Sequence, residues 1–200
     1  MYRFQPFPGM SLQIAGTNFE FVSHPLLPYD EEAVFVLEGS TAFVYQLRAL
    51  DTKQWYALKV FKPAYRGKYI AQISTFLAQH ADITAFQAER RSCLTMDNCS
   101  RLIQTFPELE YAILMPWAMT PTWTGILLNP EASAGYTFAQ ARDLALATAN
   151  TLCNIESYGW AHTDIGGSNL VPSPDRRRIQ LLDLEGFYIP GMPLPPKWSR

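Results

Sequence analysis

Cysteine, histidine and long apolar runs are scarce in this sequence, and each scarcity excludes a class of protein. Three cysteines and three histidines are scattered over 200 residues, which argues against a disulfide framework and against a zinc site. No segment reaches about 18 uninterrupted apolar residues, so we expect neither a signal peptide nor a membrane span. A protein of the reducing cytoplasm with no membrane partner is therefore the expectation.

Charge of either sign is also in short supply. The formal net charge is −2, which gives no general attraction to nucleic acid. Hydrophobic residues make up 48% of the chain and charged residues 17%, so a sizeable core can be buried. The one basic run, residues 176–178, follows the turn signal PSPD and is interpreted as the solvated tip of a hairpin.

Sheet signals dominate the first half of the chain. Residues 1–32 are rich in proline and aromatic side chains and are interpreted as an N-terminal extension packed on the domain. Two β-rich runs, 33–50 and 55–62, are joined by the polar stretch DTKQ and predict a hairpin. Residues 69–96 are compatible with two helices or one interrupted helix, and 101–117 predict two further strands with a turn at a proline.

A helix is the clearest feature of the second half, which begins near residues 116–125. Thr137 is the expected N-cap and Gly159 the expected stop. The stretch AHTDIGGSNLV follows, and IQLLDLEGF then predicts a short buried strand that ends in acidic residues and a glycine. The apolar positions that recur close to the 3.6-residue period of this helix are Ala141, Leu144, Ala145, Leu152 and Ile155.

Several motifs, taken in this order, resemble those of the protein kinase family over residues 33–190. LEGSTAFVY resembles the glycine-rich loop, of which Gly39 is retained, and Val44 occupies the apolar position over adenine. YALKVFK resembles the strand in which a small residue, Ala57, admits adenine and a lysine, Lys59, contacts the phosphates. Taken alone, each stretch has an ordinary alternative, a strand–turn–strand or a solvated lysine.

The resemblance also implies a carboxylate partner for Lys59 and a hinge that recognises adenine. In AFQAERRSCL, Glu89 resembles the glutamate of the kinase helix called αC. YAILMPWAM resembles the last strand of the small lobe and the hinge, with Met115 at the back of the pocket and backbone groups of Pro116 and Ala118 facing adenine. A strand that ends at a proline is the alternative reading of the second motif.

The stretch HTDIGGSN matches the kinase catalytic loop, H-x-D-x-x-x-x-N. The match implies that Asp164 is the catalytic base, that Asn169 binds a metal ion and that His162 orders the loop. LLDLEG resembles the strand that ends in D-F-G, with Asp183 as the main Mg²⁺ ligand, and Val171 is assigned to the nucleotide-binding set. The alternative is that these polar residues only stabilise turns.

Three departures from the kinase pattern stand out. Gly166 replaces the lysine that Ser/Thr protein kinases carry two residues after the catalytic aspartate, and Glu185 creates the Asp-x-Glu of many small-molecule kinases. Only residues 187–200 follow the D-F-G position, so we expect a fragment of a longer polypeptide whose exposed apolar faces lead to self-association.

The prediction from sequence is thus an α+β, protein kinase-like, two-lobed fold of bacterial type. A five-stranded small lobe occupies residues 33–117 and a truncated helical large lobe residues 118–200. ATP and Mg²⁺ are the expected cofactors, a protein Ser/Thr hydroxyl is the expected acceptor, and a homo-oligomer is the expected assembly. Two alternatives stay open, a small-molecule phosphotransferase of the aminoglycoside or choline kinase type and a catalytically weak pseudokinase scaffold.

Overall fold

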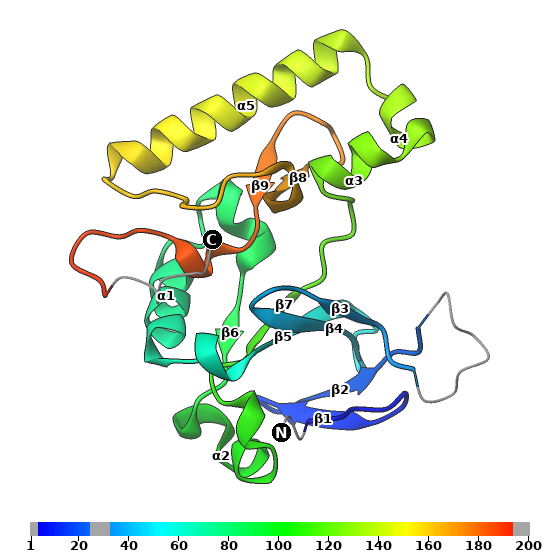
Figure 1. Ribbon diagram of the computed structural model, residues 1–200, viewed down its shortest axis with the longest axis vertical. Coiled ribbons are helices and arrows are strands. Elements are labelled where there is room, and N and C mark those ends of the chain that lie inside the picture. Colours follow the sequence, from blue (N-terminus) through cyan, green and yellow to red (C-terminus); the bar gives the residue numbers. More distant parts are fainter. Residues whose placement is uncertain (1–3, 25–32, 194–200) are drawn as a thin grey trace. The chain divides into compact units, whose positions relative to one another are not determined.

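A computed structural model describes residues 4–24 and 33–193, except for the side chains of residues 87–89. The chain divides into two compact units (Figure 1). The first unit holds residues 1–74 and 91–117, and the second holds residues 75–90 and 118–200. Helix α1 (Lys68–Gln79) begins in the first unit and ends in the second. The segment 75–90 thus groups with the C-terminal half of the chain although it precedes two strands of the first unit.

In the described part of the first unit, the strands form one antiparallel sheet of seven, rather than the five expected (Figure 1). The strand order is β1-β2-β4-β5-β7-β6. Strand β3 pairs with the first half of β4, on the edge of β4 that does not face β5. The strands are β1 (Ser11–Ile14), β2 (Thr17–Phe21), β3 (Val36–Glu38), β4 (Ala42–Ala49), β5 (Trp55–Phe61), β6 (Ser92–Cys93) and β7 (Ile113–Pro116).

The two extra strands come from the N-terminal residues that were expected as an extension. Leu12 and Ile14 on β1 and Phe19 and Phe21 on β2 are buried, in the alternation of a sheet with one face on the core. Strand β2 pairs with β4, with Phe21 opposite Leu47. The N-terminal residues therefore extend the sheet itself, and the predicted hairpin of β4 and β5 is confirmed beside them.

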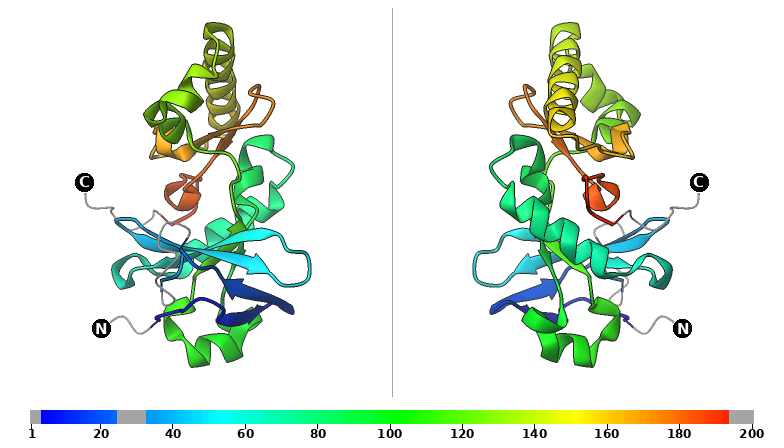
Figure 2. Two further views of the ribbon diagram at one scale, coloured as in Figure 1. Left: turned by 90° about the vertical axis from the view of Figure 1, so that its right-hand side faces the viewer. Right: turned by 90° about the vertical axis from the view of Figure 1, so that its left-hand side faces the viewer.

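Residues 101–105 were predicted as part of a strand, and that prediction is wrong because they form the end of helix α2 (Met96–Thr105). The helix begins where the Thr95 N–H donates to Asn98 Oδ1 over 2.8 Å. Cys99 has non-helical angles, φ −138° and ψ 36°, so the helix is kinked and its apolar residues lose a clean period. Helix α2 lies beside β1 (Figure 2).

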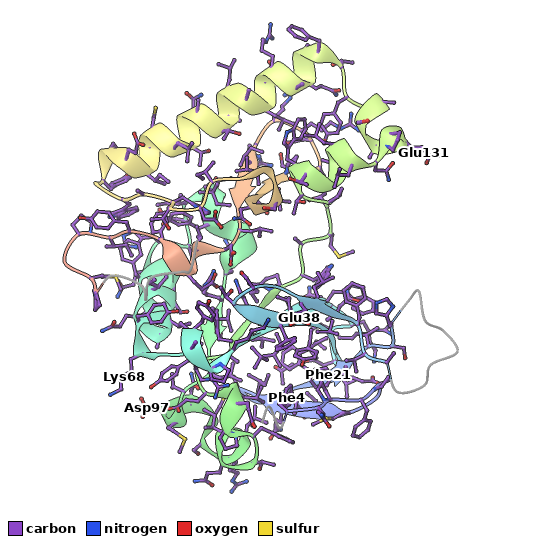
Figure 3. The ribbon with its side chains drawn as sticks, in the orientation of Figure 1. Phe4, Phe21, Glu38, Lys68, Asp97 and Glu131 are labelled. Carbon is purple, nitrogen blue, oxygen red and sulfur yellow. The ribbon has the colours of Figure 1, made fainter. Side chains whose placement is uncertain are left out.

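A single hydrophobic cluster fills the space between one face of this sheet and α2. Phe4 lies against Phe21 and Tyr45, with ring centroids 5.9 and 5.8 Å away, and Figure 3 shows Phe4 and Phe21 within the sheet region. Leu47 and Leu58 are fully buried in the same cluster. Burial of side chains of this size contributes about 1.5–3 kcal/mol each, so this face stabilises the first unit.

The second unit combines three helices with a small hairpin. The elements are the helices α3 (Trp123–Leu128), α4 (Pro130–Ala134) and α5 (Phe138–Ser157), and the strands β8 (Leu170–Pro172) and β9 (Ile179–Leu181). Short 3-10 helices cover Thr84–Glu89, Gly167–Asn169 and Leu184–Gly186. In the described part of the chain, no helix is both long and apolar enough to cross a bilayer.

Both ends of α5 lie where the sequence predicts them. The Thr137 hydroxyl accepts the N–H of Gln140, and Gly159 adopts φ 76° after the last turn. Leu144 and Ile155 are buried as expected, but Ala145 is exposed, which corrects its assignment to the core face. A small residue fits the helical period on either face, so periodicity alone does not place alanine.

Candidate active site

One face of the first unit's sheet carries the residues expected around a nucleotide. Val44 on β4 pairs with Lys59 on β5, and Ala57 on β5 pairs with Met115 on β7. Paired residues of antiparallel strands share a face, as do alternate residues of one strand. Val44, Ala57, Lys59 and Met115 therefore lie on one face, opposite the face that carries the core residue Leu58.

Lys59 is a buried cation on this face. Its side chain is 7% exposed, and its Nζ lies 5.5 Å from the centroid of the Phe61 ring. Ala57, one pleat away on the same face, is buried and small. Because a buried ammonium is stable only with polar or anionic groups around it, this position suits an anion-binding lysine.

The turn that resembles the glycine-rich loop is a tight hairpin between β3 and β4. The Gly39 N–H donates to Ala42 O over 2.9 Å. A Cβ at Gly39 would meet only Ala42 O, at 3.5 Å, so space does not require glycine there. Lys62 Nζ lies 2.8 Å from Oε1 of Glu38, the last residue of β3 (labelled in Figure 3). This ion pair stabilises the end of β3 next to the turn. Neither space nor a left-handed backbone therefore requires glycine at this turn, and the Lys62–Glu38 ion pair holds the loop in place.

The expected hinge lies where the chain leaves the first unit. Pro116 ends β7 opposite Tyr56, and the Trp117 N–H donates to Trp55 O over 3.0 Å. Ala118 is the first residue of the longer segment of the second unit. Pro116 has no N–H and offers only its carbonyl, which is the group that adenine recognition was expected to use there.

Asp164 and Asn169 meet in the second unit. Asn169 Nδ2 donates to the backbone oxygen of Asp164 over 2.9 Å and to its carboxylate Oδ2 over 3.2 Å. Asn169 is buried whereas Asp164 is exposed. The loop is thus closed on itself by a buried amide, and it presents a carboxylate at its surface.

His162 ties the same loop to the strand that precedes Asp183. The Asp164 N–H donates to His162 Nδ1 over 3.2 Å, so Nε2 is the protonated ring nitrogen and donates to Leu182 O over 2.8 Å. The ring is therefore a neutral bridge between the two motifs. This geometry agrees with the expectation that His162 orders the loop.

The hairpin of β8 and β9 brings the two expected metal ligands to the same end. Leu170 pairs with Leu181, and one step further the Leu182 N–H donates to Asn169 O over 2.9 Å. Asp183 comes next, in a left-handed backbone conformation with φ 65° and ψ 46°. Such angles are uncommon outside glycine and are often found at functional positions.

Lowering the pH is expected to loosen this loop. Burial lowers the pKa of His162 below its ordinary value of 6.5, against the opposing effects of the Leu182 carbonyl and the charges of Asp164 and Glu185. The neutral ring then contributes its full stabilisation above the unfolded-state pKa, and this contribution is lost as the pH falls through the lowered folded-state pKa. The melting temperature of the wild type should fall more steeply between about pH 7 and 5 than that of His162→Gln. Equal slopes would contradict the neutral bridge.

Gly167 is required by close packing between the loop and α3. A Cβ at Gly167 would lie 2.7 Å from Thr124 Oγ1 and 3.3 Å from the Thr124 backbone nitrogen. A Cβ at Gly166 would meet only Ser168 Oγ, at 3.7 Å. Packing thus requires glycine at position 167 but not at position 166, because only Gly167 lacks space for a side chain.

Gly167→Ala should therefore destabilise the fold by about 1–3 kcal/mol through overpacking. Gly166→Ala is the matched control, since its backbone is extended at φ −151°, and should change stability by at most about 0.5 kcal/mol. Thr124→Ala should rescue part of the loss in the double variant because it removes the clashing oxygen. Denaturant unfolding measures all four proteins, and equal stabilities of the two glycine variants would refute the packing argument.

Among solved structures, the crystal structure of the BubR1 kinase domain is similar to this chain, with a TM-score of 0.57 and 15% sequence identity. The fold is protein kinase-like. The similarity covers 90% of this chain and 50% of that chain, so the chain spans about half the length of the kinase domain that it matches. No protein-family model and no curated protein matches the sequence. A structural match at this low sequence identity supports the kinase-like fold alone. Any activity has to be argued from the residues of the site.

Glu89 does not occupy the helical position that the kinase resemblance implied. It ends a 3-10 helix, Thr84–Glu89, and its side chain lies outside the described residues. The helix that follows β5 is α1, whose sequence KYIAQISTFLAQ contains no acidic residue. A carboxylate for Lys59 therefore cannot come from α1, in contrast to the expected kinase pattern.

Glu185, the acid that creates the Asp-x-Glu sequence, is buried. Its side chain is only 2% exposed, within the 3-10 helix Leu184–Gly186 that follows Asp183. Val171, also assigned to the site, is buried in β8, where it pairs with Gln180. Among the described residues, no group of three or more His, Cys, Asp or Glu side chains is placed to hold a metal ion.

The run 176–178 was expected at a solvated hairpin tip, and it does lie in the turn between β8 and β9, where Arg177 and Arg178 are exposed and Arg176 is half-buried. The guanidinium carbon of Arg176 lies 4.2 Å from the centroid of the Tyr136 ring, and its Nη1 donates to Gly135 O. Nη1 also lies 3.3 Å from Gln140 Oε1, next to the start of α5. The arginine thus fastens the β8–β9 hairpin to the corner between α4 and α5, a contact between distant segments that sequence reasoning missed.

Proposed function

We propose that this protein transfers the terminal phosphoryl group of ATP to a hydroxyl group, with a protein Ser/Thr side chain as the acceptor. Lys59 binds the phosphates, Asp164 accepts the proton of the attacking hydroxyl, and Asn169 and Asp183 hold Mg²⁺. Phosphoryl transfer needs positioning and charge neutralisation more than covalent chemistry, and these residue types supply both.

The observation that carries this proposal is the closed network of the second unit. Asn169 donates to Asp164, the Asp164 N–H donates to His162, and the Leu182 N–H donates to Asn169. A loop that only reverses the chain does not need a buried amide beneath an exposed carboxylate. The network fixes Asp164 relative to the strand end that carries Asp183, as a base and a metal ligand in one reaction require.

The residues fit Mg²⁺ by their chemistry. Asn169 Nδ2 points toward Asp164, so the other end of that amide, the oxygen Oδ1, is turned away from Asp164. Mg²⁺ takes oxygen ligands from one or two protein groups and completes its shell with phosphates and water. The Asn169 oxygen and the Asp183 carboxylate, at the same end of the β8–β9 hairpin, are such a pair. When bound, the ion neutralises phosphate charge.

A melting experiment tests nucleotide binding. ATP with Mg²⁺ should raise the melting temperature of the wild type more than ATP with a chelator does. Asp183→Asn should lose this Mg²⁺-dependent part, and asparagine keeps the left-handed backbone accessible at that position. Asp175→Asn, a change in an exposed turn acid, is the control. A wild type that no nucleotide stabilises would favour the pseudokinase scaffold.

A small-molecule acceptor is the second candidate, favoured by Gly166 and by the buried Glu185. Gly166 leaves the loop without the lysine that steadies the phosphate in Ser/Thr protein kinases. Glu185, two residues after Asp183, is buried. Transfer of labelled phosphate to a generic protein or to small alcohols separates the two candidates.

Restoring the missing cation should increase transfer to a protein. Gly166 has extended backbone angles, φ −151° and ψ 161°, and open space at its Cβ, so a lysine is accommodated. Gly166→Lys should raise the rate of transfer to a protein acceptor by about tenfold, because an added cation stabilises the charge of the transferring group. Gly166→Met, similar in length without the charge, should not. Equal rates for the two variants would count against a protein-kinase arrangement.

A further inference from the structure

Helix α5 has a second, exposed face with apolar side chains on it. Leu144 and Ile155 are buried on the inner face, which contacts β9. Phe138 is 87% exposed and Leu146 is 56% exposed. Figures 1 and 2 show the β8–β9 hairpin on one side of α5 and no other element of the second unit on its opposite side.

These exposed residues form one stripe along the helix. Successive members are three or four positions apart, except that Leu146 directly follows Ala145, so together they occupy one side of an α-helix. The stripe combines two large apolar side chains, three small ones and one charge near each end. We call it the outer stripe of α5, and its members are Phe138, Arg142, Ala145, Leu146, Ala149, Cys153 and Glu156.

The charges of the outer stripe are complementary to those of a second, antiparallel copy of the stripe. Arg142 lies near the N-terminal end and Glu156 near the C-terminal end, and both are exposed. Two parallel copies place like charges together. Two antiparallel copies centred at position 147 instead bring each arginine to within about one helical turn, roughly 6 Å along the axis, of the partner's glutamate. Arg142 Nη2 also lies 2.9 Å from Asp143 Oδ1. This ion pair is exposed and therefore weak, so Arg142 can also attract a glutamate of a second copy.

Small side chains occupy the centre of the stripe. Ala145 and Ala149 are one turn apart, and both are exposed. The separation of packed helices is set by the side chains at their contact, so alanines at the crossing allow a close approach. An antiparallel pair centred between them places Ala145 of one copy opposite Ala149 of the other and brings Leu146 of each copy to the middle.

We propose that the outer stripe of α5 is a self-association surface on which α5 of a second copy of this chain packs antiparallel. The helix has 20 residues, so the contact extends over about 30 Å. An interface of one helix pair is small, and its dissociation constant is expected in the micromolar range, roughly 1–100 μM. The assembly is isologous, with each residue contact made twice. It does not depend on the proposed phosphoryl transfer.

Sedimentation equilibrium of the 200-residue chain tests the association. The wild type should show a monomer–dimer equilibrium, and Leu146→Arg should raise the dissociation constant by about tenfold or more because it puts a charge at the centre of the contact. Asn154→Arg, on the same helix outside the stripe, should leave the equilibrium unchanged. A chain that stays monomeric to about 100 μM, or a dimer that Leu146→Arg does not weaken, would overturn the proposal.

Disulfide trapping tests the orientation. In a Cys153→Ser background, one pool carries Ala145→Cys and a second, larger tagged pool carries Ala149→Cys. The antiparallel pair predicts that the mixed 145–149 cross-link dominates, because like positions are displaced by about 6 Å along the axis. Cys93 and Cys99 are buried and leave the exposed engineered thiols as the reactive ones. Dominant cross-links between like positions would show a parallel pair and refute the proposed packing.

Discussion

Asp164→Asn should lower the rate of phosphoryl transfer by about 10³-fold while leaving the affinity for Mg²⁺ and ATP unchanged. Asparagine has nearly the same shape as aspartate but cannot accept the proton of the attacking hydroxyl. The loop should keep its geometry, because Asn169 Nδ2 also donates to the backbone oxygen of residue 164 over 2.9 Å. Initial rates with labelled ATP, compared with the melting shift given by Mg²⁺ and ATP, separate catalysis from binding.

Asp175→Asn is the control for this experiment. Asp175 is an exposed acid of the same unit whose carboxylate is bonded within its own turn, to Ser173 and Arg178. Its replacement should leave the transfer rate within about twofold of the wild type. If Asp164→Asn kept more than about a tenth of the wild-type rate, Asp164 would not be the base.

Asn169→Asp should lower the transfer rate by about 100-fold for a different reason. The new carboxylate keeps an oxygen for the metal ion but cannot donate to Asp164, and its second oxygen replaces a nitrogen that lies 3.2 Å from Asp164 Oδ2. Two carboxylates at that separation repel, so one of them binds a proton more readily and the acid limb of the pH–rate profile moves to higher pH. Rates measured across the pH range detect this shift.

Asn169→Ala is the comparison that divides the two roles of Asn169. It removes both the metal ligand and the donor without adding charge, so it should weaken the effect of Mg²⁺ on ATP binding and move the acid limb of the pH–rate profile less than Asn169→Asp does. Asn169→Asp should keep the effect of Mg²⁺ and give the larger shift of the acid limb. A profile that Asn169→Asp leaves unmoved would show that the donation to Asp164 has no part in the reaction.

Local features of this chain could be predicted from its sequence because their determinants lie within a few residues. The β4–β5 hairpin follows from two β-rich runs around a polar turn, and the ends of α5 follow from Thr137 and Gly159. The β8–β9 hairpin, with the metal-ligand candidates at one end, follows from the spacing between the HTDIGGSN and LLDLEG motifs. The kinase-like fold was reached from the order of such local motifs.

Features that depend on contacts between distant segments could not be predicted in this way. The pairing of β2 with β4 gives no signal in either strand alone, so the N-terminal strands were interpreted as an extension. Arg176 reaches Gly135, 41 positions earlier, and only the folded hairpin brings the two together. The kink at Cys99 interrupts the period of α2, which made part of a helix resemble a strand. In each case the local pattern is uninformative or misleading.

The central claim is that Lys59 and Asp183 are both required for the proposed binding of a Mg²⁺-nucleotide. Calorimetric titration with Mg²⁺ and a non-hydrolysable ATP analogue tests it most directly. The account predicts one site per chain, weakened about tenfold or more by Lys59→Met and by Asp183→Asn. The controls Lys62→Met, whose lysine pairs with Glu38, and Asp175→Asn should leave that affinity unchanged. An affinity that either Lys59→Met or Asp183→Asn leaves at the wild-type value would contradict the proposed roles of these two residues.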